Sequence, residues 1–261
     1  MISPLAHVDP AAKIGNNVTI HPFAFIDADV VIGDDCEIFP YVSIVRGTRL
    51  GKNNKIYQNT VIGADPQDFR WKGQPSYCTI GDNNVIRENV IINRGFNSNE
   101  GTVVGNDCFI MAMTHIGHDS VIEGKCVLGN NVVIAGEARV GKCSILSSAV
   151  MLHENSRIGD WVLVKGGCRI SGNVPPYIIM AHNPASYFGV NAFVLRKNGH
   201  SEEQIDEIAK AYRHVYQCGT SVFNAMKRIE ADIDPSPIRD SVLGFIRDSK
   251  MKLVGIPRDL E

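Results

Sequence analysis

Residues 104–134 read VGNDCFIMAMTHIGHDSVIEGKCVLGNNVVI, with an aliphatic residue at every sixth position. These aliphatic positions are Val104, Ile110, Ile116, Ile122, Leu128 and Ile134. Neither a helix, with a period of about 3.6 residues, nor an ordinary strand, with a period of about 2, requires this spacing. The repeat predicts a β-solenoid in which each hexad forms one short strand and a corner.

The same frame covers most of the chain. It runs from Val8 to Ile62, resumes at Ile80, Ile86 and Ile92, and continues from Val104 to Ile170. Three hexads would complete one coil of a triangular prism, with the aliphatic side chains pointing inward. Since one coil cannot bury these side chains alone, we expect coils to be stabilised by stacking on their neighbours.

The residues around each aliphatic position suggest corners. The residue two places earlier is almost always small, as at Ala24, Thr114 and Ala138. A glycine often follows the aliphatic residue, and Asn–Asn pairs recur at 53–54, 83–84 and 130–131. Both residue types tolerate positive φ, so we expect left-handed backbone at these glycines and asparagines.

Composition limits the function classes. A net charge of −2 gives no electrostatic reason to expect nucleic acid binding. The chain has no evident signal peptide or membrane-spanning run, so we expect a cytoplasmic protein. Five of the seven cysteines occupy the small corner position and are interpreted as corner fillers rather than disulfide or metal ligands: Cys36, Cys78, Cys108, Cys126 and Cys168.

Two segments interrupt the repeat. Between Ile62 and Ile80 the inward positions would be Asp68 and Gln74, and burying these polar groups unpaired would cost several kcal/mol. A second interruption puts Ser98 in the inward frame. We therefore predict loops at about 63–79 and 93–103, where binding residues could lie.

The repeat ends after Ile170, and a different domain follows. Ser201 and Gln204 form a capping box for a helix that ends near Gly219. Further helices are expected at about 221–233 and from Pro237. We predict a solenoid over residues 1–190, and over 191–261 a small helical domain that covers the open end of the prism.

His115 and His118 flank the inward-facing Ile116, so both should lie outside the aliphatic core. Asp119 could hold the His118 ring in one tautomer, as a general base requires. Solvated surface histidines are one alternative to this hypothesis. A zinc site is another, but it needs a third ligand, and His153 is poorly placed to supply it within one chain.

Several motifs occur in an order that resembles one family. They are Gln67-Asp68, Ile86-Arg-Glu-Asn-Val90, Asn93-Arg-Gly95, His115-x-x-His118-Asp119, Ala135-Gly136, His153, Val174-Pro-Pro-Tyr177 and Phe188-Gly-Val-Asn191. The chain resembles the UDP-N-acetylglucosamine O-acyltransferases that begin lipid A synthesis. This resemblance implies a left-handed parallel β-helix, although the general crossover rule would favour the opposite hand.

The resemblance also implies an activity: transfer of a 3-hydroxyacyl chain from acyl carrier protein to the sugar 3-hydroxyl of UDP-N-acetylglucosamine, without a metal or other cofactor, in a homotrimer. His118 would be the base, Asp119 would orient it, and the Gly136 N–H would stabilise the oxyanion. The implied substrate-binding residues are Gln67, Asp68, His115, His153, Asn191 and Lys197.

Four positions depart from the family pattern. Glu137 replaces a histidine, Asn93 replaces another histidine, Glu154 replaces a glutamine and Phe193 replaces an acidic residue. An extra carboxylate near a diphosphate is repulsive unless it is paired. Two alternatives therefore stay open: an N-acyltransferase acting on an amino sugar nucleotide, and a non-catalytic paralogue that binds sugar nucleotide or carrier protein.

Overall fold

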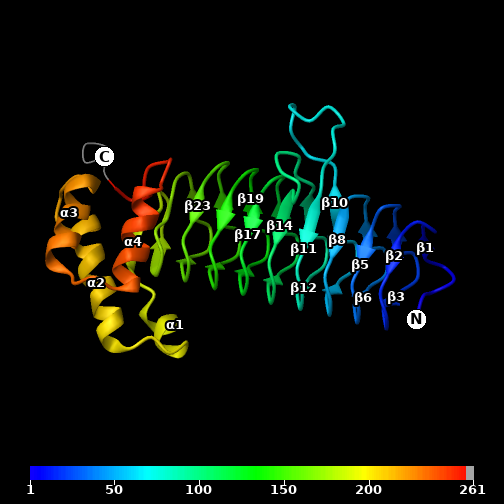
Figure 1. The fold of residues 1–261 in the computed structure, drawn as a ribbon, viewed down its shortest axis with the longest axis horizontal. Coiled ribbons are helices and arrows are strands. Elements are labelled where there is room, and N and C mark those ends of the chain that lie inside the picture. The colour runs from blue at the N-terminus through cyan, green and yellow to red at the C-terminus, as the bar shows by residue number, and fades with distance from the viewer. Residues whose placement is uncertain (257–261) are drawn as a thin grey trace.

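The computed structural model describes residues 1–256, which form a prism followed by a helical domain (Figure 1). Three sheets make the walls of the prism. The strands from His7 to Ile170 are parallel and pass to successive walls, and the last strand, Ser186–Val190, pairs antiparallel with the strand Ile178–Ala181. This arrangement confirms the predicted β-solenoid with a small helical domain. Among the described residues, no helix has the length and apolar character needed to cross a membrane.

We name each wall after its first strand and give its strands in spatial order. The β1 sheet contains β1 (His7–Val8), β4 (Phe25–Ile26), β7 (Ser43–Ile44), β10 (Val61–Ala64), β13 (Ile91–Asn93), β16 (His115–Ile116), β19 (Val133–Ile134), β22 (Met151–Leu152) and β25 (Arg169–Ile170). The β2 sheet contains β2 (Lys13–Ile14), β5 (Val31–Ile32), β8 (Thr48–Leu50), β11 (Cys78–Ile80), β14 (Thr102–Val104), β17 (Val121–Ile122), β20 (Arg139–Val140) and β23 (Arg157–Ile158). The β3 sheet contains β3 (Thr19–Ile20), β6 (Glu37–Ile38), β9 (Lys55–Ile56), β12 (Val85–Ile86), β15 (Phe109–Ile110), β18 (Val127–Leu128), β21 (Ile145–Leu146), β24 (Leu163–Val164), β26 (Ile178–Ala181) and β27 (Ser186–Val190).

The aliphatic residues form the core in the predicted register. Ile116 pairs with Ile92 on one side and Ile134 on the other, and all three are fully buried. Burying one such side chain contributes about 1.5–3 kcal/mol. The five corner cysteines are also buried and have free thiols.

The prediction of left-handed backbone at the corners is correct for the asparagine pairs and wrong for most of the glycines. One asparagine of each Asn–Asn pair has left-handed backbone: φ is 53° at Asn53, 60° at Asn83 and 57° at Asn131. Of the glycines that follow an aliphatic residue, only Gly63 has positive φ, so the prediction is wrong for the others. Glycine is needed at these positions because adjacent coils approach closely. For example, a Cβ on Gly33 would lie 2.7 Å from the backbone of Gly51.

The two breaks in the repeat are loops, 65–77 and 94–101, that leave the prism side by side. The first is the large cyan excursion beside β10 and β11 in Figure 1. Backbone bonds of 2.8 Å in both directions join Tyr77 to Gly95. The buried Arg94 guanidinium donates to Gly63 O at 2.6 Å, to Ser76 Oγ at 2.9 Å and to the Asp65 carboxylate. Together these bonds link the bases of both loops.

The helical domain contains α1 (Ala192–Lys197), α2 (Glu202–Tyr216), α3 (Val222–Asp232) and α4 (Pro237–Arg247). The Ser201–Gln204 capping box is present, whereas α1 was not predicted. Tyr212 of α2 donates from its hydroxyl to Pro176 O at 2.7 Å, which ties the helix to the end of the prism. The predicted domain extends to residue 261, but 257–261 lie outside the described residues.

Candidate functional site

The candidate site lies on the β1 sheet, where the two loops leave the prism. Its floor consists of small residues on successive coils: Gly117, Ala135 and Gly136. The loops and the neighbouring strands enclose a pocket above this floor. The residues lining it are Gln67, Asp68, Phe69, Arg70, Asn93, His115, Gly117, His118, Val133, Ala135, Gly136 and Glu154.

His118 lies outside the aliphatic core, as predicted, yet only 7% of it is exposed because the loops cover it. Its Nδ1 is 3.0 Å from Asp119 Oδ2, and the Phe96 ring stacks on the imidazole at 5.5 Å between centroids. The other oxygen of Asp119, Oδ1, accepts the Asn97 backbone N–H at 2.8 Å. The carboxylate is therefore fixed relative to the ring and favours a proton on Nδ1, which leaves Nε2 available as a base.

Asp68 reaches His118 from the first loop. Its Oδ2 is 3.2 Å from His118 Nε2 and also accepts Arg70 Nη2 at 2.5 Å and Nε at 2.9 Å. Hydrogen bonds from the Arg70 side chain, more than any other cause, lower the pKa of Asp68 to about 2. Asp68 is thus ionised at neutral pH and can only accept hydrogen bonds, so its contact with Nε2 must be broken before Nε2 can take a proton from an acceptor hydroxyl.

Gly136 is in direct contact with the same imidazole. A Cβ at this position would be 2.3 Å from His118 Nε2 and 2.6 Å from Cε1. The absence of a side chain therefore permits the ring to sit over the Gly136 backbone. The backbone N–H of this residue, which faces the His118 ring, is a candidate to stabilise an oxyanion that forms beside the base.

His115 and Asn93 complete the polar lining. Burial lowers the pKa of His115, so its imidazole is neutral at physiological pH and serves as a hydrogen-bonding group. Asn93 is 1% exposed and donates from Nδ2 to Asp65 O at 2.5 Å. Among residues 1–256, its buried Oδ1 has no hydrogen-bond partner.

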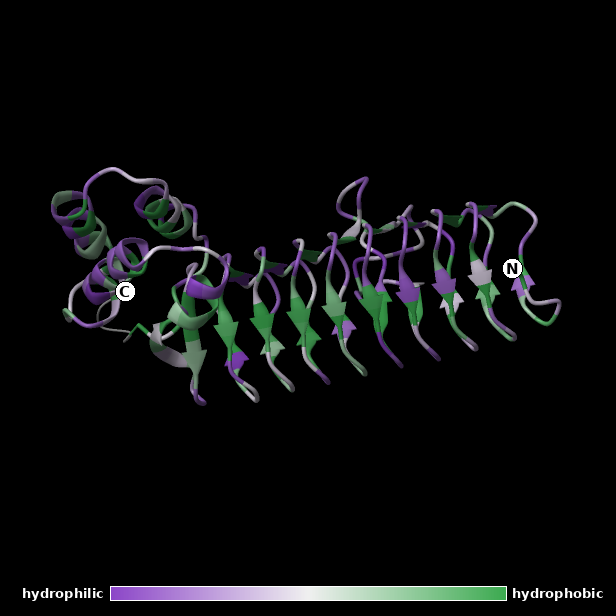
Figure 2. Cartoon of the chain, turned by 90° about the horizontal axis from the view of Figure 1, so that it is seen from below, coloured by the Kyte–Doolittle hydropathy of each residue, from purple (hydrophilic) through white to green (hydrophobic). Residues whose placement is uncertain are grey.

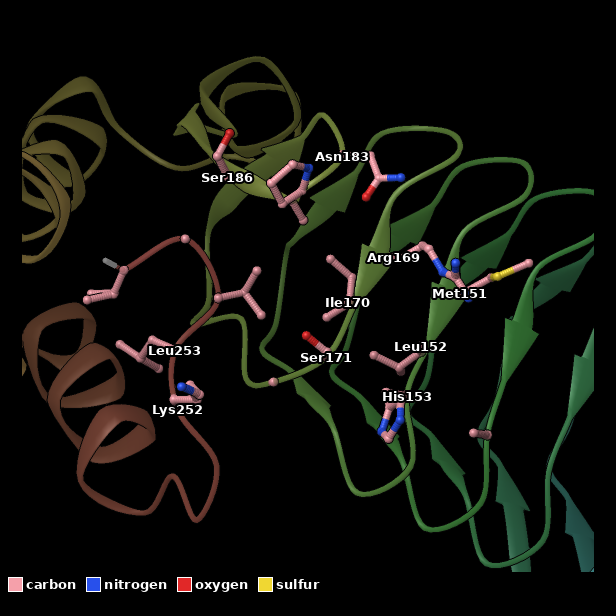
Figure 3. A pocket seen from close by; sticks show the side chains of 17 residues that line it. Met151, Leu152, His153, Arg169, Ile170, Ser171, Asn183, Ser186, Lys252 and Leu253 are labelled. Carbon is pink, nitrogen blue, oxygen red and sulfur yellow. The ribbon is translucent and has the colours of Figure 1, made fainter. Parts of the chain in front are cut away.

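A second pocket continues along the β1 sheet from Ala135, which it shares with the first. His153 lies in this pocket, one coil beyond Ala135. Figure 3 shows His153 on the prism side and Leu253 on the C-terminal segment that faces it. With Val254 and Ile256, this segment makes the far end of the groove apolar.

Asn191 and Lys197 line neither of these pockets. Asn191 is buried, and its Nδ2 donates to Trp161 O at 2.9 Å. Lys197 is exposed, with its ammonium 4.6 Å from the Phe193 ring centroid. A single chain therefore brings together Gln67, Asp68, His115, His118 and Gly136, with His153 in the adjoining groove.

Three residues around His118 were not identified from the sequence: Arg70, Phe96 and Asn97. All three lie in the predicted loops, which was the only available signal, because a six-residue frame does not predict contacts between two excursions. In the described part of the chain, no group of three or more His, Cys, Asp or Glu side chains could hold a metal ion.

The coils and the histidine site define the class as hexapeptide-repeat transferases, and the model for "Bacterial transferase hexapeptide (six repeats)" matches residues 29–64 and 101–136. A second model, "Udp N-acetylglucosamine O-acyltransferase; Domain 2", matches residues 173–256. An acyl-(acyl-carrier-protein)–UDP-N-acetylglucosamine O-acyltransferase of Xanthomonas euvesicatoria is 41% identical over 97% of both chains.

Solved structures give the same result. The UDP-N-acetylglucosamine acyltransferase of Bacteroides fragilis is 44% identical, with a TM-score of 0.95 over 99% of this chain and 100% of that chain. The enzyme of Francisella novicida is 33% identical, with a TM-score of 0.94 over 99% and 95%. The chain belongs to the UDP-N-acetylglucosamine O-acyltransferase family.

Proposed function

We propose that the protein transfers a 3-hydroxyacyl chain from acyl carrier protein to the 3-hydroxyl of UDP-N-acetylglucosamine. This transfer is the first step of lipid A biosynthesis. We assign His118 as its general base. The observation that carries the assignment of the base is the position of His118, held by Asp119 on one nitrogen and facing the pocket with the other. Family membership supports the substrates. Transfer from acyl carrier protein suggests a cytoplasmic reaction.

The chemistry follows from the positions of these groups. His118 Nε2 removes the proton as the sugar oxygen attacks the thioester carbonyl carbon, and the Gly136 N–H stabilises the negative charge that forms on the carbonyl oxygen. When the intermediate collapses, the carbon–sulfur bond breaks and the imidazolium returns the proton to the departing thiolate. A thioester is already activated, so one base and correct positioning are sufficient.

Before the reaction, the sugar must reach Nε2, where Asp68 lies 3.2 Å away in the unliganded pocket. We assign Asp68 and Gln67 to the acceptor sugar, so that the 3-hydroxyl replaces the Asp68 contact with His118. Neutral His115, which also lines this pocket, supplies a further hydrogen-bonding group for the substrate. His153 is assigned to the groove that holds the rest of the substrates.

Apolar side chains on the outer faces of two walls of the prism support a homotrimer. On the β3 sheet, the outward positions from β12 to β24 are apolar: Val85, Phe109, Val127, Ile145 and Leu163. In Figure 2, which colours the backbone by hydropathy, the strands on the near face change from polar near the N-terminus to apolar toward the helical domain. The β1 sheet presents Phe25, Ile91, Val133 and Met151, each at least 37% exposed. The outer face of the β2 sheet is more mixed, with Lys13, Arg49, Arg139 and Arg157 beside Val31, Val103 and Val121. Three prisms around one axis would bury two walls of each.

This packing would place the His118 groove between subunits. Lys197, which is exposed and lies outside the groove of its own chain, could then approach the substrates bound by a neighbour, whereas the Asn191 side chain is buried against Trp161 of its own chain. Mixing a His118→Ala variant with a Lys197→Ala variant, after dissociation and reassembly, should yield some trimers with intact sites and restore part of the activity. If neither variant restores the other, each site belongs to one subunit.

The function is tested by supplying 3-hydroxyacyl carrier protein with either UDP-N-acetylglucosamine or its 3-amino analogue. We expect an ester product from the natural sugar, and His118→Ala should lower its rate of formation by about 10²- to 10⁴-fold. Amide formation alone would support the N-acyltransferase alternative. Wild-type protein that binds substrates without turnover would support the non-catalytic one.

A further inference from the structure

Glu137, which replaces the histidine of the family pattern, contacts both loops through one oxygen. Its Oε1 accepts Arg70 Nη2 from the first loop at 2.7 Å and Asn97 Nδ2 from the second loop at 3.1 Å. Arg70 is also 3.7 Å from Glu154, another departure from that pattern. The extra carboxylate at 137 is thus paired with a guanidinium and is not a free negative charge.

These contacts close a ring around His118. From Glu137 the ring passes through Arg70 to Asp68, and Asp68 Oδ2 lies 3.2 Å from His118 Nε2. In the other direction Asn97 donates its backbone N–H to Asp119, and Asp119 Oδ2 lies 3.0 Å from His118 Nδ1. Both carboxylates that contact the imidazole are therefore connected to Glu137.

We infer that Glu137 is a positioning residue: it holds the two loops so that Asp119 stays on Nδ1 of His118 and Asp68 stays beside Nε2, where the acceptor sugar can take over its contact. Without it, Arg70 and Asn97 lose their common acceptor, and each loop is tied to the site only by its own remaining bonds. The imidazole would then sample orientations that do not point Nε2 at the acceptor hydroxyl. Glu137 itself need not touch the substrate. The inference rests on the proposed role of His118.

The effects of Arg70 and Glu137 on kcat should therefore depend on each other. Glu137→Ala should lower kcat on the order of 10- to 100-fold, with a smaller change in KM for the sugar nucleotide, since a misplaced base mainly affects the chemical step. Glu137→Gln keeps an oxygen for both donors and should retain more activity. Since Arg70 acts through the same ring, adding Arg70→Ala to Glu137→Ala should cost less than the product of the two single effects.

A matched control is Glu230→Ala, which removes a surface arginine–glutamate pair of similar length, with Arg247 at 3.1 Å, in the helical domain. It should leave kcat unchanged. Additive losses in the Arg70 and Glu137 variants, or a rise in KM with kcat retained, would overturn the inference and indicate separate contacts with substrate.

Hydrogen exchange separates this inference from the assignment of the base. Faster exchange in residues 65–77 and 94–101 of Glu137→Ala, measured without substrate, would support the ring even if His118→Ala proved fully active. Unchanged exchange in both loops would contradict the ring even if His118→Ala proved inactive.

Discussion

Replacing Gly136 by alanine should remove activity without unfolding the protein. The added Cβ would lie 2.3 Å from His118 Nε2, whereas ordinary contacts begin near 3.4 Å, so the ring must move by about 1 Å. The three atoms nearest the new methyl group all belong to the His118 side chain, so the ring can move while the coils keep their stacking. A 1 Å misplacement of a catalytic group can cost about 10²-fold in rate.

The assay measures kcat/KM for acyl transfer together with thermal unfolding. We expect a loss of about 10²-fold in kcat/KM and a small change in melting temperature, because strain from one extra methyl group costs about 1–3 kcal/mol at most. Gly244→Ala is the control, since its Cβ would have no neighbour within 4 Å, and it should retain full activity. Wild-type rates in Gly136→Ala would refute the close-contact argument.

Three further predictions concern Asp119, Ile122 and His115. Asp119→Asn should lower kcat on the order of 10²- to 10⁴-fold, because an amide can donate to Nδ1 and favour the proton on Nε2; an unchanged kcat would exclude an orienting role. Ile122→Ala should lower the free energy of unfolding by about 2–5 kcal/mol in a denaturant titration, since Ile122 is fully buried; a loss below about 1 kcal/mol would contradict its place in the stack. Burial lowers the pKa of His115, so its NMR signals should titrate below the ordinary value of 6.5. Because the unfolded chain then binds the proton more tightly, the contribution of His115 to the free energy of unfolding falls as the pH drops below 6.5. Titration at or above 6.5 would show that the imidazole is solvated.

The coil architecture was predictable because its signal is local and repeated. Each hexad carries the same aliphatic position, so one frame identified inward residues from Ile20 to Ile170 and located both loops. The reason for the glycines was not predictable from residue type alone. Gly33 is required by the distance to the next coil, not by its own φ. The handedness came from the family resemblance.

The site was predictable only in part. His118 and Asp119 are adjacent in the sequence, and their contact follows from that. The contacts of Arg70 with Glu137 and of Asn97 with Asp119 join loops to coils across 67 and 22 residues. They depend on how two irregular segments fold over the β1 sheet, which no periodic pattern encodes. Glu137 was recognised from the sequence as a departure from the family pattern, whereas its partners Arg70 and Asn97 are known only from the structure.

In the proposed mechanism, His118 Nε2 takes the proton from the acceptor hydroxyl of the sugar. A crystal structure of the protein with its acylated sugar nucleotide would test it most directly, through the distance from His118 Nε2 to the ester oxygen on carbon 3. We predict about 2.6–3.2 Å, with Asp68 moved onto the sugar. An ester oxygen well beyond hydrogen-bonding distance, or bound to a different side chain, would contradict the account.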